Sequence, residues 1–128
     1  MTIQMFFCII LNDEIRKFYF KKSPTAKNGG ATLMSEKTNI NIDLNIEVQC
    51  EDICKIVDRL KFVDVLKIDV EGAEYELLNK IYESNTYKKI GSIYFEDHSR
   101  KIFSSRFFDL KSKVIKNFNS INKELYWW

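Results

Sequence analysis

The sequence predicts an α/β fold, in which the strands of a mostly parallel sheet alternate with helices. Residues 63–70 form a β-branched, nearly continuous apolar run, which is typical of a strand buried on both faces of a parallel sheet. After Glu71 and Gly72 the apolar period becomes that of a helix, and a second apolar run follows at 90–95. Strand, helix and strand in this order form the unit from which parallel sheets are built.

The N-terminal half is expected to contribute shorter strands. Residues 6–11 are predicted to form a buried strand, and residues 15–20 a second one after a turn at 12–14. The polar, glycine-ended segment 21–30 is the clearest loop in the chain.

Two further patterns precede the central strand. Residues 40–49 alternate between apolar and polar side chains, which predicts a half-buried strand. Residues 51–62 place apolar side chains at spacings of three, four and seven, which predicts a short helix.

The helix that begins at Ala73 is expected to carry Glu74 and Glu76 in its first turn, where carboxylates complement the helix dipole. Glu76 and Lys80 are spaced as an i,i+4 ion pair. A last helix is predicted at 104–118, with a tail behind it.

The composition excludes several classes of protein. Twenty Lys and Arg against eighteen Asp and Glu give a net charge of +2, which demands no polyanionic partner. The longest apolar run, 5–11, has seven residues, whereas a membrane-spanning helix needs about 20, so no membrane partner is expected. Three cysteines suit a reducing, cytoplasmic location. We interpret Cys50 and Cys54 as small buried hydrophobes rather than zinc ligands.

Acidic residues follow both central strands. Asp69 and Glu71 share one side if the strand geometry continues, and Glu96 and His98 share one side by the same argument. Neighbouring parallel strands lie about 5 Å apart, so the four side chains are expected to converge on one crevice. In open parallel sheets, ligands bind at this end of the strands.

Other interpretations of these residues stay open. Glu71 as a cap of the following helix is an equal alternative, and His98 taken alone is typical of a solvated loop. Asp69, Glu96 and His98 are admissible metal ligands, but their spacing is not diagnostic, and we expect no metal.

The segment 66–74, Leu-Lys-Ile-Asp-Val-Glu-Gly-Ala-Glu, resembles the hallmark of the FkbM-type family of S-adenosylmethionine-dependent methyltransferases. Segments 28–33, 46–56 and 93–98 are similar to the family in order and spacing. The resemblance extends over residues 6–101.

The resemblance implies a Rossmann-like domain that transfers a methyl group to a hydroxyl of a sugar, glycan or natural product. It implies that Asp69 and Glu71 lie beside the reacting methyl group, with Asp69 also contacting the cofactor. It places Glu96 and His98 toward the acceptor, and which of the four residues is the base stays open.

The resemblance also implies an incomplete sheet, because no pair of the four glycines has the spacing of the family's glycine-rich loop. Segment 6–11 resembles the third strand of the family. We therefore expect the N-terminal strand–helix units to be absent and the strand that carries Asp69 to expose an unpaired edge. Residues 1–128 would form one partial domain, with 102–128 as C-terminal helix and tail.

Such a chain would come from a truncated or split gene, and we expect little activity from it on its own. A second chain that supplies the missing half or covers the sheet edge is a possible partner. The alternative function is a non-catalytic interaction module that pairs with a partner chain. A nucleic-acid surface on the basic C-terminal third ranks last, because a solvated amphipathic helix explains the same lysines.

Overall fold

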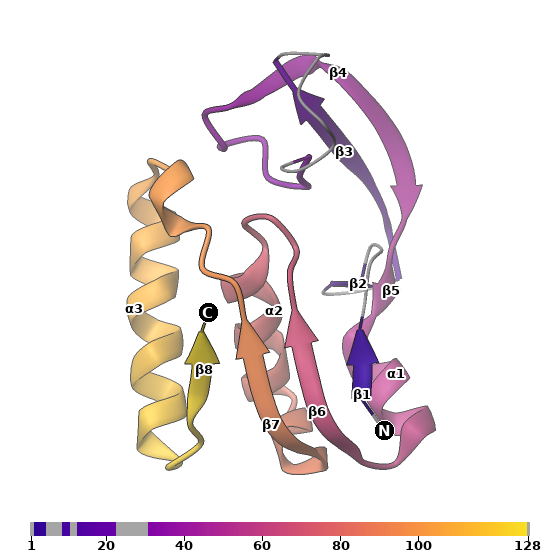
Figure 1. Cartoon of the computed structure of the whole chain (residues 1–128), viewed down its shortest axis with the longest axis vertical. Coiled ribbons are helices and arrows are strands. Elements are labelled where there is room, and N and C mark those ends of the chain that lie inside the picture. The colour runs from indigo at the N-terminus through magenta and orange to yellow at the C-terminus, as the bar shows by residue number, and fades with distance from the viewer. Residues whose placement is uncertain (1, 5–8, 11–12, 23–30, 128) are drawn as a thin grey trace.

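The computed structural model describes residues 2–4, 9–10, 13–22 and 31–127. Its centre is a parallel sheet, and the helices α2 and α3 pack against the sheet and against each other (Figure 1). The predicted mixed α/β fold is thus confirmed. The strands lie in the order β1 (Thr2–Gln4), β6 (Val63–Ile68), β7 (Ile90–Phe95) and β8 (Leu125–Trp127), and the two helices are α2 (Glu74–Glu83) and α3 (Ser105–Ser120).

The unit β6–α2–β7 forms where the apolar periods predict it. Leu66 pairs with Ile93 and Ile68 with Phe95, and all four side chains are buried in the core. The ring of Tyr75, from α2, meets Phe95 edge-on at 5.7 Å between ring centroids. This packing fixes the two strand ends at the same level of the sheet.

The opposite face of the sheet is less well covered. Val65 and Lys67 alternate with the buried residues of β6 and are only half-buried, and Tyr94 of β7 is 38% exposed. The predicted burial of the central strand on both faces is therefore wrong, because the helices lie against one face only (Figure 1).

The edge of β6 has a partner. Thr2 of β1 pairs with Val65 in parallel register, so the expected unpaired edge on this strand is contradicted. The predicted strand at 6–11 lies largely outside the described residues. Its described part, β2 (Ile9–Ile10), pairs with β5 (Glu51–Asp52) in a separate two-stranded sheet.

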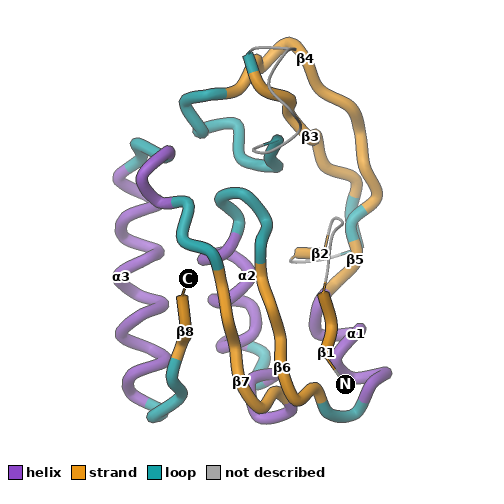
Figure 2. Tube along the Cα trace, in the orientation of Figure 1, coloured by secondary structure: helices purple, strands orange, loops and turns teal. Residues whose placement is uncertain are grey.

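Strands β3 (Ile15–Lys21) and β4 (Ile40–Gln49) form an antiparallel ribbon that extends beyond the C-terminal ends of the sheet strands (Figure 2). Both strands were predicted, but most of the loop expected at 21–30 lies outside the described residues. The half-buried character predicted for β4 is wrong. Ile42, Leu44 and Ile46 are 58%, 50% and 50% exposed, because this part of the ribbon stands away from the core.

Helix α1 (Ile53–Leu60) confirms the predicted short helix. It begins at Asp52, whose carboxylate accepts a hydrogen bond from the backbone N–H of Cys54. Ile53, Ile56 and Val57 form its buried face.

The second half of the chain contains two departures from the sequence-based expectations. The C-terminal tail forms strand β8, which was not predicted, and the ring of Tyr126 stacks there on that of Tyr94 at 4.8 Å between ring centroids. The carboxylate of Glu76 lies 3.3 Å from Arg16, a contact that the sequence did not predict. Among the described residues, no helix is long and apolar enough to span a membrane.

Candidate functional site at the strand ends

The ends of β6 and β7 are held together by the backbone. The N–H of Glu96 donates to the carbonyl of Ile68 at 3.0 Å, which continues the pairing one residue beyond β7. The chain then turns sharply after β6, with a φ of 51° at Glu71 and 119° at Gly72. The φ of Gly72 favours glycine, and a Cβ there would lie 2.8 Å from Ile102 Cδ1, so the end of that side chain would have to shift.

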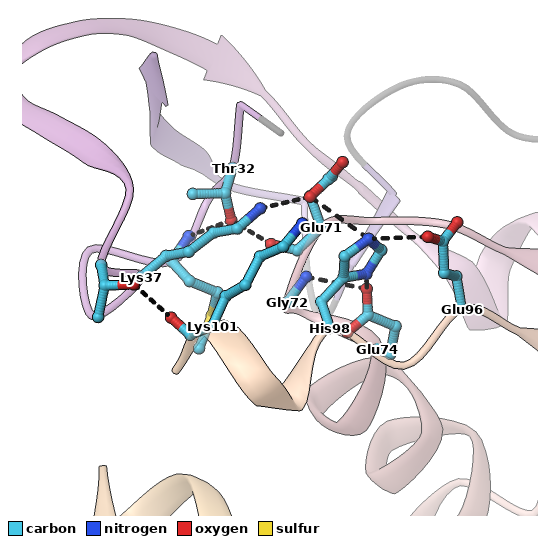
Figure 3. A network of polar contacts seen from close by, with 10 residues as sticks. Thr32, Lys37, Glu71, Gly72, Glu74, Glu96, His98 and Lys101 are labelled. Atoms are coloured by element: carbon cyan, nitrogen blue, oxygen red, sulfur yellow. Dashed lines mark hydrogen bonds and ion pairs between the residues drawn. The ribbon is translucent and has the colours of Figure 1, made fainter. Parts of the chain in front are cut away.

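The four residues that the sequence placed at the strand ends lie together. Nε2 of His98 is 3.4 Å from Oε2 of Glu71 and 3.4 Å from Oε1 of Glu96 (Figure 3). Ligand-type atoms of Asp69, Glu71 and His98 all lie within 4.8 Å of one another. The structure therefore brings Asp69, Glu71, Glu96 and His98 into one cluster, while their catalytic roles stay predictions.

Glu74 is part of this cluster, although the sequence analysis treated it only as a carboxylate in the first turn of the helix. Its side chain is fully buried, and Oε1 lies 2.7 Å from Nδ1 of His98. The same oxygen accepts the N–H of Gly72 at 2.8 Å. A signal was present, since Glu74 shares the helical stripe of Leu78 and Ile81, which is the buried face of α2.

Lys37 is a second residue that sequence reasoning missed. It lies in the segment between β3 and β4, is only 2% exposed, and its Nζ donates to Oε2 of Glu71 (Figure 3). In the same segment, the hydroxyl of Thr32 donates to the backbone carbonyl of Glu71 at 2.6 Å. The backbone N–H of Thr38 donates to the carbonyl of Lys101 at 3.1 Å, which ties the segment to the far side of the cluster.

These contacts settle the alternative reading of Glu71 as a helix cap. The cap position of α2 is Ala73, which has no side-chain cap, and the carboxylate of Glu71 points to Lys37 and His98. His98 is likewise no solvated loop residue, since it is 5% exposed.

The cluster shifts the pKa values of its members. Burial raises the pKa of the Glu71 carboxyl, but the hydrogen bond and charge of Lys37 outweigh burial and hold it below its usual value. Burial lowers the pKa of Lys37, and the bond to Glu71 offsets only part of that effect. Burial also lowers the pKa of His98, but the carboxylates of Glu74, Glu71 and Glu96 prevail and raise it.

Access to the cluster is uneven. Asp69 is exposed, and the side chain of Glu96 is 41% exposed, whereas His98 and Glu74 lie beneath them. A bound molecule would therefore meet the two outer carboxylates first. His98 and Glu74 form the inner support.

The comparison with protein families agrees with this picture. Residues 5–121 match the family model described as the methyltransferase FkbM domain. This range contains both strand ends, α2 and the segment that carries Lys37. Comparisons with curated proteins and with solved structures gave no match.

Proposed function

The chain belongs to the FkbM methyltransferase family, and from this premise we propose that its strand-end cluster is the reacting end of a methyl-transfer site. The methyl donor would be S-adenosylmethionine, and the acceptor a hydroxyl group of a sugar, glycan or natural product. The observation that carries the proposal is the convergence of Asp69 and Glu71 from one strand end with Glu96 and His98 from the next. Ligands of open parallel sheets bind at this edge.

The charge of the cluster suits the reactive end of the donor, which is a sulfonium cation. Four carboxylates lie together with Lys37, Lys101 and one imidazole, so with all four ionised the group stays negative even when the imidazole is protonated. We propose that Asp69, the exposed carboxylate, contacts the sulfonium end. The carboxylates are Asp69, Glu71, Glu74 and Glu96.

The adenosine end of the donor has no such counterpart in the sequence. The four glycines, at 29, 30, 72 and 91, do not have the spacing of a glycine-rich nucleotide loop. We therefore expect the chain on its own to bind the donor weakly, with a Kd of about 1 mM or above. A second chain that completes the donor site remains part of the proposal.

The acceptor hydroxyl would lie between the two exposed carboxylates. In the transfer, an oxygen–carbon bond forms as the carbon–sulfur bond breaks, and the hydroxyl loses its proton. Holding the oxygen in line with the methyl group provides most of the rate. We propose that Glu96 accepts the proton, since it is exposed and lies against His98 at 3.4 Å.

The cellular location and the nature of the partner are two further parts of the proposal. We propose a reducing, cytoplasmic location, which the presence of only three cysteines in the sequence supports. Lys111 and Lys113 of α3 contact Asp97 and Glu83 of this chain, at 2.8 Å and 2.9 Å. This pairing supports the expectation that nucleic acid is not the partner.

A backbone NMR titration of the full chain with S-adenosylmethionine tests the proposal without knowledge of the acceptor. The amide signals of 69–72 and 96–98 are expected to shift, and the shifts are expected to shrink in Asp69→Asn. The matched control is Asp43→Asn, an exposed aspartate on β4, which is expected to behave as the wild type. The absence of shifts, or shifts that cluster elsewhere in the chain, would contradict donor binding at the strand ends.

A further inference from the structure

The cluster contains a set of side chains of the kind that binds metal ions. One nitrogen of His98 and one oxygen each of Asp69 and Glu71 lie within 4.8 Å of one another. The set is more than a group of surface acids, because the imidazole is 95% buried and reaches the carboxylates from a different strand end. Its Nε2 points at the carboxylate of Glu71 (Figure 3).

The orientation of His98 is fixed from behind. An ionised Glu74 can only accept hydrogen bonds, so it favours the tautomer of His98 that carries a proton on Nδ1, 2.7 Å away. In the neutral imidazole, the lone pair is then on Nε2. A carboxylate behind a histidine is the arrangement that orients metal-binding imidazoles and increases their basicity.

The lone pair of Nε2 faces negative oxygens. Oε2 of Glu71 and Oε1 of Glu96 are both 3.4 Å from Nε2, too far for good hydrogen bonds between nitrogen and oxygen. The imidazole and the carboxylates therefore present ligand-type atoms to one common space.

One separation in the set already matches that of ligands on a cation. Ligands bound at about 2.1 Å in a tetrahedral arrangement lie about 3.4 Å from one another, which is the distance from Nε2 of His98 to Oε2 of Glu71. The set as a whole lies within 4.8 Å, so the exposed carboxylate of Asp69 would move inward on binding. Lys37 uses one lone pair of Glu71, and a carboxylate offers about four, so the same carboxylate retains sites for a metal. One imidazole with two carboxylates is a mixed set that suits divalent first-row transition metals.

We propose that Asp69, Glu71 and His98 bind one divalent transition-metal cation, of the type of Mn²⁺ or Zn²⁺. The sequence analysis expected no metal here. Three protein ligands leave coordination positions open for water or for an oxygen of a bound molecule. The inference goes beyond methyl transfer and is tested without any methyl donor.

The test is calorimetric titration of Mn²⁺, and separately of Zn²⁺, into the full chain after treatment with a chelator. We expect one site per chain. Asp69→Asn and His98→Gln are expected to weaken binding about tenfold or more. Asp69 is exposed, so its substitution is expected to preserve the fold, and far-UV circular dichroism checks both variants. Asp43→Asn, on β4, is the control and keeps the wild-type affinity.

Two results would overturn the site. The first is no binding of either metal by the folded wild-type chain. The second is wild-type affinity in either Asp69→Asn or His98→Gln, because each residue is a required ligand in the proposal.

Discussion

Nδ1 of His98 lies 2.7 Å from Oε1 of Glu74, a residue 24 positions earlier in the chain, and both side chains are almost completely buried. The contact joins the segment behind β7 to the first turn of α2. Since Glu74 also accepts the N–H of Gly72, one carboxylate connects the helix, the sharp turn and the imidazole. The geometry of the exposed carboxylates depends on this buried pair.

Replacing Glu74 is expected to destabilise the protein strongly. Glu74→Ala leaves the imidazole of His98 and the N–H of Gly72 without their buried acceptor, and we expect a loss of about 3 kcal/mol in the free energy of unfolding. Urea unfolding measures it. The control is Glu83→Ala on the same helix, whose exposed contact with Lys113 is worth at most about 1 kcal/mol. Equal losses in the two variants would show that the buried pair is not important.

The contributions of Lys37 and Glu71 to the free energy of unfolding are expected to depend on each other. Lys37→Met leaves the half-buried carboxylate without its cation, and we expect the free energy of unfolding to fall by about 3 kcal/mol. In the double variant Lys37→Met/Glu71→Gln the uncompensated charge is gone, so most of this loss is expected to return. A double variant that is less stable than Lys37→Met would contradict this coupling.

Gly72 is expected to tolerate no side chain. Gly72→Ala forces a Cβ into a backbone with φ of 119° and against Ile102, so we expect a loss of about 2 kcal/mol in thermal or urea unfolding. Asn122→Gly is the contrasting variant. Asn122 has φ of 52° and is exposed, and glycine there is expected to change stability by no more than about 0.5 kcal/mol. A Gly72→Ala variant with the same free energy of unfolding as the wild type would contradict this prediction.

The ion pair between Asp97 and Lys111 predicts that the stability of the fold decreases at acidic pH. Burial raises the pKa of Asp97, but the hydrogen bonds from Lys111 and from the N–H of Ser99 outweigh it and bring the pKa below 3.8. A carboxyl group whose pKa is lower in the folded state than in the unfolded state stabilises the fold at pH values above its unfolded-state pKa. This stabilisation is lost as the pH falls through the folded-state pKa.

Urea unfolding between pH 5 and pH 2 therefore distinguishes the wild type from Lys111→Met. The variant starts with less of this stabilisation, so its stability is expected to fall less steeply in that range than that of the wild type. Parallel curves would mean that Lys111 does not set the pKa of Asp97.

Periodicity was sufficient to predict the elements that build the site. The apolar runs at 63–70 and 90–95 and the helical stripe between them predicted β6, α2 and β7, because each pattern matches the way its element is buried. The meeting of Asp69 and Glu71 with Glu96 and His98 followed from parallel pairing. Two adjacent parallel strands end at the same edge of the sheet.

Other parts depend on long-range packing that no local pattern records. Lys37 lies in an irregular segment, and its ion pair with Glu71 spans 34 positions. The exposed apolar face of β4 alternates as a buried one would, since alternation shows which residues share a face and not what covers it. Strand β8 is three residues long, too short for a period to be recognised.

Methyl transfer from labelled S-adenosylmethionine to a panel of sugars, glycans and other hydroxyl compounds tests the central claim most directly. With the full 128-residue chain and a donor concentration above about 1 mM, at which the weak donor site fills, we expect slow formation of labelled product with at least one acceptor. Its rate is expected to fall at least about tenfold in Asp69→Asn and in Glu96→Gln, while Asp43→Asn is unaffected. No product with any acceptor, or product formed at the wild-type rate by Asp69→Asn/Glu96→Gln, would contradict the assignment of methyl transfer to these strand ends.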